Sequence, residues 1–559
     1  MTYSNDWWRK AVIYQIYPKS FFDTNGDGCG DIKGIYQKLD YLADLGVDAL
    51  WISPMYTSPM KDNGYDISDY YRIDPLFGTN EELYQLISAA HSKKIKIIMD
   101  FVANHTSDQH QWFLESQQSK DNPYSDFYIW KDPKPDGSEP NNWGSHFGGS
   151  AWEYCSVRNQ YYLHYYAKEQ PDLNWENEGV RQAIYQAMRF WAEKGIDGWR
   201  MDVITEISKY TDFPDYETNS EIPVVGFMHS NGPRLHEFIQ EMHREVFEPY
   251  GLMTVGEAQD SDAQMAQMFL DRERKELDMM FTFEHMDVDV EPDTPNRKWQ
   301  LQAFNLPKLK RVFADWQTSL VNVGWNALYF ENHDRPRIIS RWGNDTDYRY
   351  ESATAFATIL HGQKGTPFIY QGEEIGMTNI KLPLSEYDDV EISNNYQELV
   401  EKNQTLSHKE FIAAVYQIGR DNARTPMQWN RQENAGFTNG TPWFPVNQRY
   451  LEINVSCDQV DRQSISEYYK QLIYLRHTEA ILTEGSFVLL LEKDEKIFAF
   501  ERTLENETWL ILANLSAETL EFPPSLRREH SRRIIQNYPE ANQTVLRPYE
   551  STIISYQNK

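Results

Sequence analysis

The feature that most constrains the fold is a repeated pattern in which a helical segment leads into a short, β-branched strand. It recurs in YLADLGVDALWISP, ELYQLISAAHSKKIKIIMDFV, YQAMRFWAEKGIDGWRMDVI and LHEFIQEMHREVFEPYGLMTVGE. Parallel strands need a crossover connection between them, and a helix is the usual one. The sequence therefore predicts an α/β fold with a parallel sheet and crossover helices. A chain of 559 residues can also carry smaller domains beside it.

Two regions depart from this pattern. Between His105 and Leu173 the chain becomes rich in aromatic residues, Pro, Gly and Asn, as in PKPDGSEPNNWGSHFGGSAWEY. We interpret this stretch as an inserted excursion. After about Gly485 only short strand-like runs remain, among them IFAFER, TWLILANLS and STIISY, which predict a small all-β domain.

Charge and cysteine content exclude several classes of function. The formal net charge of -30 argues against a nucleic-acid partner, because binding to phosphates requires clustered Lys and Arg. The three cysteines, Cys29, Cys155 and Cys457, have no CxxC spacing, so neither a disulfide framework nor a zinc site is indicated. The N-terminus lacks an apolar run of signal-peptide length, and no segment has the roughly 18 apolar residues of a spanning helix. We expect a cytoplasmic protein without a membrane or an obligate protein partner.

The stretch GWRMDVI places two charged residues in what reads as a buried strand. Residues at i and i+2 of a strand face the same side, so Arg200 and Asp202 project together, opposite to Met201 and Val203. A salt bridge inside the sheet is one interpretation, because buried charges are usually paired.

Other strand ends favour a functional site. IIMDFVANH ends in Asp100, Asn104 and His105, LMTVGEA contains Glu257, and WNALYFENHD ends in Asn332, His333 and Asp334. A parallel barrel gathers catalytic groups at the carboxyl ends of its strands. These groups would then meet at one edge of the fold.

The motifs DFVANH, GWRMDVI, TVGEA and FENHD, in that order, resemble the strand-end motifs of the α-amylase superfamily of glycoside hydrolases. QPDLNW at 170–175 is similar to the marker of its oligo-1,6-glucosidase group, and the resemblance extends from VIYQIYPKSF to GRDNARTPMQW. It implies a (β/α)₈ TIM barrel with a small domain inserted after the third strand and a C-terminal β-sandwich. The predicted limits are 1–104 and 173–484 for the catalytic barrel, 105–172 for the inserted domain and 485–559 for the sandwich.

The resemblance implies catalytic roles for three carboxylates. Asp202 would be the nucleophile, Glu257 the general acid and then base, and Asp334 the group that stabilises an oxocarbenium-like transition state. Arg200 would keep Asp202 ionised, whereas Glu257 needs a raised pKa to carry a proton. A retaining mechanism predicts about 5–5.5 Å between nucleophile and acid, against roughly 6.5–9.5 Å for an inverting one.

The resemblance also implies how the sugar is held. His105 and His333 would bind hydroxyls, Tyr65 would underlie the first glucose, and Asp62 with Arg420 would close the pocket. Lys298 and Glu391 align with second-subsite residues of dextran glucosidases. Val203 matches a position where valine accompanies α-1,6 cleavage and threonine or alanine accompanies α-1,4 cleavage, although a valine is also ordinary strand packing.

These assignments imply a retaining, exo-acting α-glucosidase that hydrolyses α-1,6 bonds at the non-reducing end of isomalto-oligosaccharides or dextran fragments. The same framework is shared by trehalose-6-phosphate hydrolase, by α-1,4-glucosidases and by sucrose isomerases. Non-enzymatic ectodomains that chaperone transporters also belong to the superfamily, but they lack the complete set of carboxylates.

The segment DTNGDGCGD suggests a structural ion. Its candidate oxygen ligands are Asp23, Asn25, Asp27, the Cys29 carbonyl and Asp31. Gly34 stands where an EF-hand loop requires its bidentate Glu, so an EF-hand is not expected. The resemblance implies Ca²⁺ outside the chemistry, with Mg²⁺ as an alternative ion and an Asx-rich turn as the interpretation without a metal.

Overall fold

The computed structural model describes residues 6–218, 225–259, 261–290, 297–528, 530–540, 542 and 544–557. Within these ranges eight parallel strands close into a barrel, which confirms the predicted sheet and fold class. The barrel strands are β1 (Ile13–Ile16), β2 (Ala49–Ile52), β5 (Lys96–Val102), β9 (Gly198–Asp202), β10 (Met253–Glu257), β11 (Met279–Phe281), β12 (Asn326–Leu328) and β13 (Thr366–Tyr370). Strand β1 pairs with both β2 and β13, which closes the barrel.

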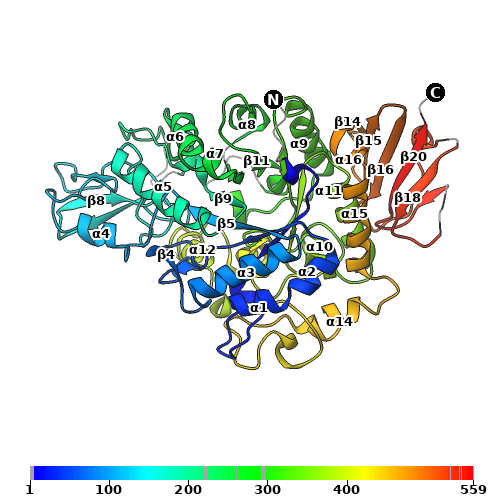
Figure 1. Ribbon diagram of the computed structural model, residues 1–559, viewed down its shortest axis with the longest axis horizontal. Helices are drawn as coiled ribbons and strands as arrows, with labels where there is room; N and C mark the ends of the chain where they lie inside the picture. Colours follow the sequence, from blue (N-terminus) through cyan, green and yellow to red (C-terminus); the bar gives the residue numbers. More distant parts are fainter. Residues whose placement is uncertain are drawn as a thin grey trace.

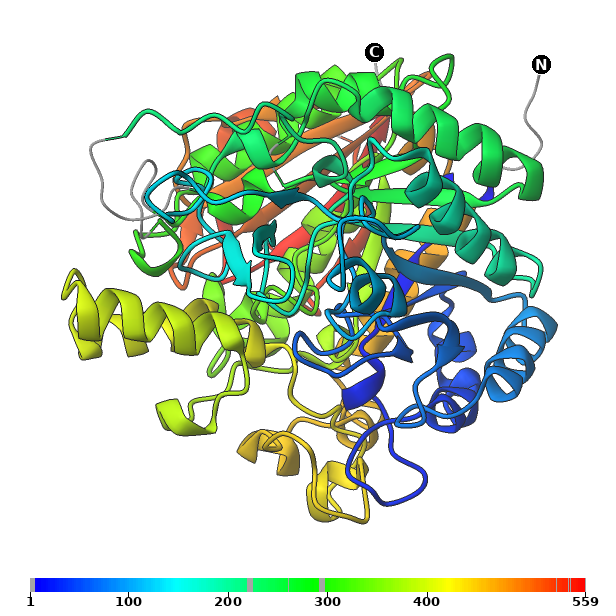
Figure 2. The same ribbon diagram turned by 90° about the vertical axis from the view of Figure 1, so that its left-hand side faces the viewer.

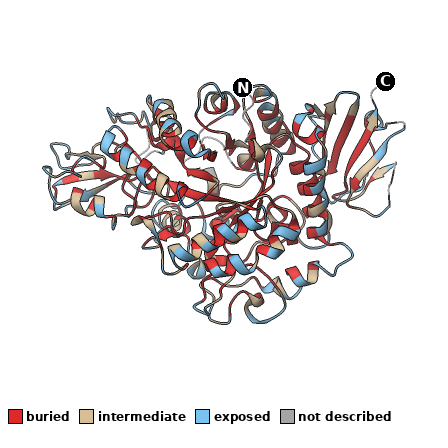
Figure 3. Cartoon of the chain, viewed as in Figure 1, coloured by how far each residue is buried: buried red, intermediate tan, exposed pale blue. Residues whose placement is uncertain are grey.

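Helices cover the barrel, and their sequences show why they form there. In α5 (Glu178–Ala192) the residues Val180, Ile184, Met188 and Trp191 recur at helical spacing and are buried. Helix α3 (Asn80–Ser92) begins with a capping box between Thr79 and Glu82. Figure 3 shows the result, with buried barrel strands inside helices that are buried on one face and exposed on the other.

The remaining helices of the barrel region follow the chain. They are α1 (Ile32–Gln37), α2 (Leu39–Leu45), α6 (Leu235–Met242), α7 (Glu248–Tyr250), α8 (Ala263–Leu270), α9 (Leu306–Ser319), α10 (Ile338–Arg341), α11 (Arg349–His361), α12 (Val390–Asn395), α13 (His408–Ile418), α14 (Val455–Asp458), α15 (Ile465–Thr478) and α16 (Ile481–Glu484). A short antiparallel pair, β3 (Tyr56–Thr57) and β4 (Asp69–Ile73), lies between β2 and α3.

The excursion predicted after the third barrel strand is present between β5 and β9. It contains α4 (Gln111–Ser116) and an antiparallel sheet of β6 (Trp130–Lys131), β8 (Gln160–Leu163) and β7 (Trp152–Cys155). Figure 1 shows α4 and β8 at one end of the long axis and the C-terminal strands at the other. Figure 2 looks from the side of the excursion and shows that the yellow-green helical segment of about 390–418 lies at this same end of the molecule.

The C-terminal region is an all-β unit, as predicted. Its strands are β14 (Ser486–Leu490), β15 (Ile497–Leu504), β16 (Glu507–Asn514), β17 (Leu520–Glu521), β18 (Arg532–Gln536), β19 (Val545–Leu546) and β20 (Ser551–Gln557). The buried Lys310 of α9 fastens this unit to the barrel, because its Nζ donates to the carbonyls of Leu491, Asp494 and Ile497. The residue limits that separate the three regions stay a prediction, and residues 1–5 and 558–559 of those ranges lie outside the described chain.

The strand predicted across GWRMDVI ends earlier than expected. Strand β9 stops at Asp202, and Val203 has φ 37° and ψ 44°, a left-handed conformation that is rare for a β-branched residue. The prediction that Val203 projects opposite to Asp202 from a continuing strand is therefore wrong. The chain instead turns sharply directly after Asp202 and enters a 3₁₀ turn at Ile204–Glu206.

Candidate active site

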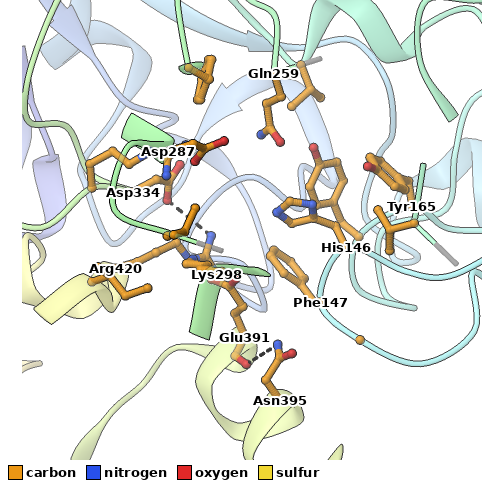
Figure 4. Close-up of a pocket in the computed structure, with 18 of the residues that line it drawn as sticks. His146, Phe147, Tyr165, Gln259, Asp287, Lys298, Asp334, Glu391, Asn395 and Arg420 are labelled. Atoms are coloured by element: carbon orange, nitrogen blue, oxygen red, sulfur yellow. Dashed lines mark hydrogen bonds and ion pairs between the residues drawn. The ribbon is translucent and has the colours of Figure 1, made fainter. Parts of the chain in front are cut away.

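A cavity of about 940 Å³ opens at the carboxyl ends of the barrel strands. Its walls also include residues 145–149 of the excursion and the segment around α12. Figure 4 shows this arrangement, with His146, Phe147 and Tyr165 on one side and Glu391, Asn395 and Arg420 on another. The predicted residues that line the cavity are Asp62, Tyr65, His105, Asp202, Glu257, Lys298, Asp334, Glu391 and Arg420. Arg200 and His333 do not line it but contact residues that do.

One buried guanidinium holds together three carboxylates at the base of the cavity. Arg200 Nη1 lies 3.0 Å from Asp100 Oδ1 and 2.5 Å from Asp202 Oδ1, and Nη2 lies 2.5 Å from Glu257 Oε2. Barrel pairing brings them together, because Arg200 is in register with Asp100 on β5 and with Val255 on β10. The predicted shared orientation of Arg200 and Asp202 is present in the structure.

This cluster cannot easily lose all its protons. Full ionisation would leave two negative charges uncompensated around one guanidinium in a buried site. Burial raises the pKa of Asp202 well above its ordinary value, and Glu257 and Asp100 act in the same direction, whereas Arg200 opposes the rise. Burial of Asp202 and Asp100 thus favours the retention of a proton within the cluster.

The turn at Val203 links the ends of β9 and β10. Its backbone N–H donates to Glu257 Oε2 over 3.2 Å, and the Gln259 Nε2 donates to Glu257 Oε1 over 3.4 Å. The Val203 side chain is buried against Phe147 and Tyr166 of the excursion. Val203 therefore lies between the carboxylate cluster and the cavity wall.

Asp334 is surrounded by groups that stabilise its negative charge. Its Oδ1 lies 2.8 Å from Arg424 Nη2 and 3.3 Å from Arg420 Nη1, and its Oδ2 lies 3.0 Å from His333 Nε2. Burial alone would raise the pKa of Asp334, but His333, Arg420 and Arg424 together hold that pKa well below its ordinary value. Asp334 is therefore ionised.

Tyr65 packs flat on His333. The ring centroids lie 5.2 Å apart with an interplanar angle of 6°, and the Tyr65 hydroxyl lies 2.7 Å from His333 Nε2. The same hydroxyl donates to Asp100 Oδ2 over 3.0 Å. A continuous network thus connects His333 to the Arg200 cluster.

Arg420 has a partner that the sequence interpretation missed. Its guanidinium forms two hydrogen bonds with Asp389, at 2.9 and 2.5 Å, whereas the predicted partner Asp62 lies 3.8 Å away. Glu391 Oε2 lies 3.4 Å from Arg420 Nε and 2.5 Å from Lys298 Nζ. Asp389 therefore fixes the orientation of Arg420. Glu391 contacts both Arg420 and Lys298 and so connects these two side chains.

Gln170 of the QPDLNW marker is a second residue without a predicted role. Its Nε2 lies 3.1 Å from both Asp62 Oδ2 and His105 Nε2, and its side chain is fully buried. Burial raises the pKa of Asp62 to about 7 and lowers the pKa of His105 to about 4. The marker thus connects the excursion to Asp62 and His105 in the cavity wall, where His105 is neutral.

The predicted ion loop lies outside the cavity. Asp23, Asn25 and Asp27 each accept a hydrogen bond from the backbone N–H two residues later, as in Asx turns. Asp31 caps α1 through the N–H of Gly34. The donor set is all oxygen and suits a hard cation, but in the described ranges no three His, Cys, Asp or Glu side chains gather as around a metal.

Gly28 gives the ion loop its shape. Its φ of 95° lies in the left-handed region, and an added Cβ would come within 1.8 Å of the carbonyl oxygen of Thr441. Only glycine fits at this position. The loop is therefore packed closely against the segment around Thr441.

Known proteins resemble this chain over almost its full length. The α-amylase catalytic domain family matches residues 15–485. An oligo-1,6-glucosidase of Heyndrickxia coagulans is 58% identical over 98% of this chain and 99% of its own. A trehalose-6-phosphate hydrolase of Bacillus subtilis is 47% identical over 99% and 98%. The crystal structure of the trehalose-6-phosphate hydrolase from Bacillus licheniformis superposes with a TM-score of 0.91 at 47% identity, covering 99% of this chain and 100% of that one.

A helix that could cross a membrane is not found among the described residues, because none is both long and apolar enough. The expected cytoplasmic location stays a prediction.

The buried carboxyl of Asp62 predicts a pH-dependent stability. Because the folded pKa of about 7 lies above the ordinary value of about 3.9, the folded state binds this proton more tightly, and stability falls as pH rises from about 4 to 7. Asp62→Asn should remove the part of this pH-dependent fall in stability that comes from the Asp62 carboxyl. Between pH 5 and 8 the free energy of unfolding of the variant should rise relative to that of wild type by about 2–3 kcal/mol, as measured by urea unfolding.

The exposed Asp212→Asn is the control and should show no such change between the two pH values. Identical pH slopes for wild type and Asp62→Asn would contradict the assignment of a raised pKa to Asp62.

Proposed function

The chain belongs to the α-amylase family of glycoside hydrolases, and we propose that it is a retaining, exo-acting α-glucosidase that cleaves α-1,6 bonds. Relatives named oligo-1,6-glucosidase, 58%, 56% and 50% identical to it, support this proposal. The observation that carries it is the arrangement of Asp202 and Glu257 on one guanidinium. Asp334, Asp62 and Arg420 line the same cavity, and Asp62 and Arg420 lie 3.8 Å apart.

In the first step Asp202 attacks the anomeric carbon while Glu257 gives its proton to the leaving oxygen. The glycosidic C–O bond breaks, the shortened sugar leaves as an alcohol, and a glucosyl ester forms on Asp202. Arg200 contacts both carboxyl groups and so sets their relative position. The Val203 N–H and Gln259 orient Glu257 toward the same site.

In the second step Glu257 removes a proton from water, the water oxygen attacks the anomeric carbon, and the ester to Asp202 breaks. Glucose is released with its original anomeric configuration, and both carboxyl groups return to their starting states. Asp334 stays ionised because His333, Arg420 and Arg424 hold its pKa low. Its charge stabilises the positive charge that develops on the sugar ring in both steps.

The charge of the cavity favours a neutral substrate over trehalose 6-phosphate. Its described lining contains nine carboxylates and five Lys or Arg side chains. Lys298 contacts Glu391, and Arg420 contacts Asp389, so these cations already have acidic partners. A dianionic phosphate beside Lys298 would also face Glu391 and Glu398, whose negative charges would oppose its own.

The position of Val203 supports the linkage part of the proposal. Its side chain lines the cavity next to Asp202 and is held by Phe147 and Tyr166. The left-handed backbone of the turn fixes its direction. A branched, apolar group there narrows the path to the second sugar, and the longer α-1,6 linkage gives that sugar more freedom to pass it.

Azide rescue tests the roles of the two carboxyl groups. Glu257→Ala should lower kcat/KM on isomaltose by about 10²–10⁴-fold, because the leaving oxygen loses its proton donor. On α-glucosyl fluoride, whose leaving group needs no proton, kcat/KM should fall much less. Added azide should then yield α-glucosyl azide from Glu257→Ala, and β-glucosyl azide from Asp202→Ala.

Glu398→Gln, a wall position outside the carboxylate cluster, serves as the control for these variants. A single azide anomer from both Ala variants would contradict the assignment of acid and nucleophile, and so would equal losses of Glu257→Ala on the two substrates.

A substrate panel tests the linkage. Relative kcat/KM should be highest for isomaltose and isomaltotriose, and lower for maltose, sucrose and trehalose 6-phosphate. Val203→Thr and Val203→Ala should raise the maltose-to-isomaltose ratio about tenfold, which corresponds to about 1.4 kcal/mol in transition-state discrimination. Val203→Ile keeps the branched apolar character and should leave the ratio within about threefold. A wild-type preference for maltose, or a ratio that neither substitution moves, would show that Val203 does not set the linkage.

We also propose that the loop at 23–31 binds a structural Ca²⁺. The all-oxygen donors Asp23, Asn25, Asp27 and the Cys29 carbonyl support this, as does the glycine that shapes the loop. The ion would add stability without entering the chemistry, because the loop residues do not line the cavity.

Removal of the ion should lower the melting temperature while kcat at low temperature stays unchanged. Protein treated with a chelator, with metal loss verified by elemental analysis, should recover its melting temperature with Ca²⁺ and less fully with Mg²⁺. Asp27→Ala should lose this dependence. An unchanged melting temperature in verified metal-free protein would rule the ion out as a stabiliser.

A further inference from the structure

Gln15 lies on β1, beneath the cavity residues Tyr65 and Asp334 that contact His333. The residue is 1% exposed. Its Nε2 lies 2.8 Å from Nδ1 of His333 and 3.2 Å from Oγ of Ser53. These contacts join the first barrel strand to a loop 318 residues later in the chain.

The opposite ring nitrogen of His333 faces the cavity side. Its Nε2 lies 2.7 Å from the Tyr65 hydroxyl and 3.0 Å from Asp334 Oδ2. An ionised carboxylate only accepts hydrogen bonds, and the contacts of Asp334 with Arg424 and Arg420 keep it ionised whatever the charge of His333. Nε2 must therefore carry a hydrogen.

We propose that Gln15 is a positioning residue that keeps His333 neutral, with its single proton on Nε2, by donating an amide hydrogen to Nδ1. A neutral imidazole has one N–H and one acceptor nitrogen, so a donor at Nδ1 and an acceptor at Nε2 define one tautomer. The two hydrogens of the Gln15 amide then go to Ser53 and His333. The reversed amide would place its oxygen at Nδ1, and that oxygen would need a second proton on the ring.

The charge of His333 matters because Asp334 is its neighbour. An imidazolium 3.0 Å from Asp334 would cancel much of the negative charge that the carboxylate presents to the sugar. It would also add a positive charge beside a reacting ring that itself becomes positive. Gln15 thus protects the electrostatic contribution of Asp334 to the transition state, an argument that rests on the glycosidase function proposed above.

The Asp334 carboxylate at Nε2 favours a charged ring, and the Gln15 amide at Nδ1 opposes this. The titratable and charged side chains that face it are Tyr17, Tyr65, Asp100, Asp334 and Arg424. Tyr17 and Tyr65 stack on the ring, and Arg424 Nε donates to the His333 carbonyl. Among these, only Asp334 contacts a ring nitrogen as an anion, and it does so at Nε2.

Gln15→Glu is the decisive variant because it preserves shape and reverses the hydrogen bond. A carboxylate at position 15 accepts a hydrogen from Nδ1, so it stabilises the doubly protonated ring. At neutral pH we expect kcat to fall about 10–100-fold with KM within about threefold, because the loss is confined to the transition state. Activity should recover as pH rises and the ring loses its second proton. In Gln15→Met, which offers neither a donor nor an acceptor to Nδ1, kcat should fall about tenfold. This loss should not recover as pH rises.

Nitrogen NMR of protein with ¹⁵N-labelled histidine reads the proton directly, and a His333→Asn sample identifies the His333 signals. Wild type should show one protonated and one unprotonated ring nitrogen, and Gln15→Glu should show two protonated nitrogens. Gln317→Glu is the matched control, since it also introduces a carboxylate at a buried glutamine, but in α9 outside the site. It should leave the His333 signals and the pH profile unchanged.

Two protonated nitrogens in wild type, or a Gln15→Glu protein with wild-type signals and pH profile, would overturn the proposal. The NMR comparison needs no substrate. If the chain hydrolysed no glucoside, the NMR result would still decide the role of Gln15, whereas the substrate panel would have rejected the function. If Gln15→Glu did not fold, the wild-type and Gln15→Met spectra would decide it.

Discussion

The site depends on the contact between one guanidinium and three carboxylates. Arg200 is buried with Asp100, Asp202 and Glu257 around it, at distances of 2.5–3.0 Å. Removing the guanidinium would leave buried carboxylates without a cation, which is far more costly than losing an exposed ion pair. The barrel can hold this cluster because its strands converge there in fixed register. The positions of Asp202 and Glu257, the proposed nucleophile and acid, are thus consequences of strand pairing and one shared partner.

The architecture was predictable because its signals are local. A helix that leads into a β-branched strand is visible within about 20 residues, and its repetition indicates a parallel sheet without knowledge of any contact. The short strands after Gly485 and the excursion between β5 and β9 were visible for the same reason. The sequence places Val203 in a strand, whereas the structure places it in a turn, because its conformation is not a local preference. A β-branched residue favours a strand, and the left-handed turn is imposed by the environment, including the bond from its N–H to Glu257.

The site was predictable only in part, for a related reason. Groups that end a strand, such as Asp202 and Glu257, could be found because an apolar run is followed by a charge. Asp389, Gln170 and Gln15 act on partners that are 31 to 318 residues away, and nothing in their own segments identifies those partners. Their roles follow from geometry alone. Asp389 bonds twice to Arg420, and Gln170 joins Asp62 to His105.

Chemistry and selectivity are therefore built from different parts of the chain. The carboxylates and Arg200 belong to the barrel, where a displacement would disturb strand register. Phe147 belongs to the excursion and Glu391 to the segment at 390–418, and both reach the cavity from outside the barrel. The wall around the second sugar can thus change without altering the positions of Asp202 and Glu257. Val203 is the exception, because its side chain meets the wall while its N–H holds Glu257. A substitution of Val203 therefore changes the pocket wall and the position of Glu257 together. Its effect on linkage has to be judged by the ratio of kcat/KM on two substrates, because a change at Glu257 that affects both substrates equally cancels in that ratio.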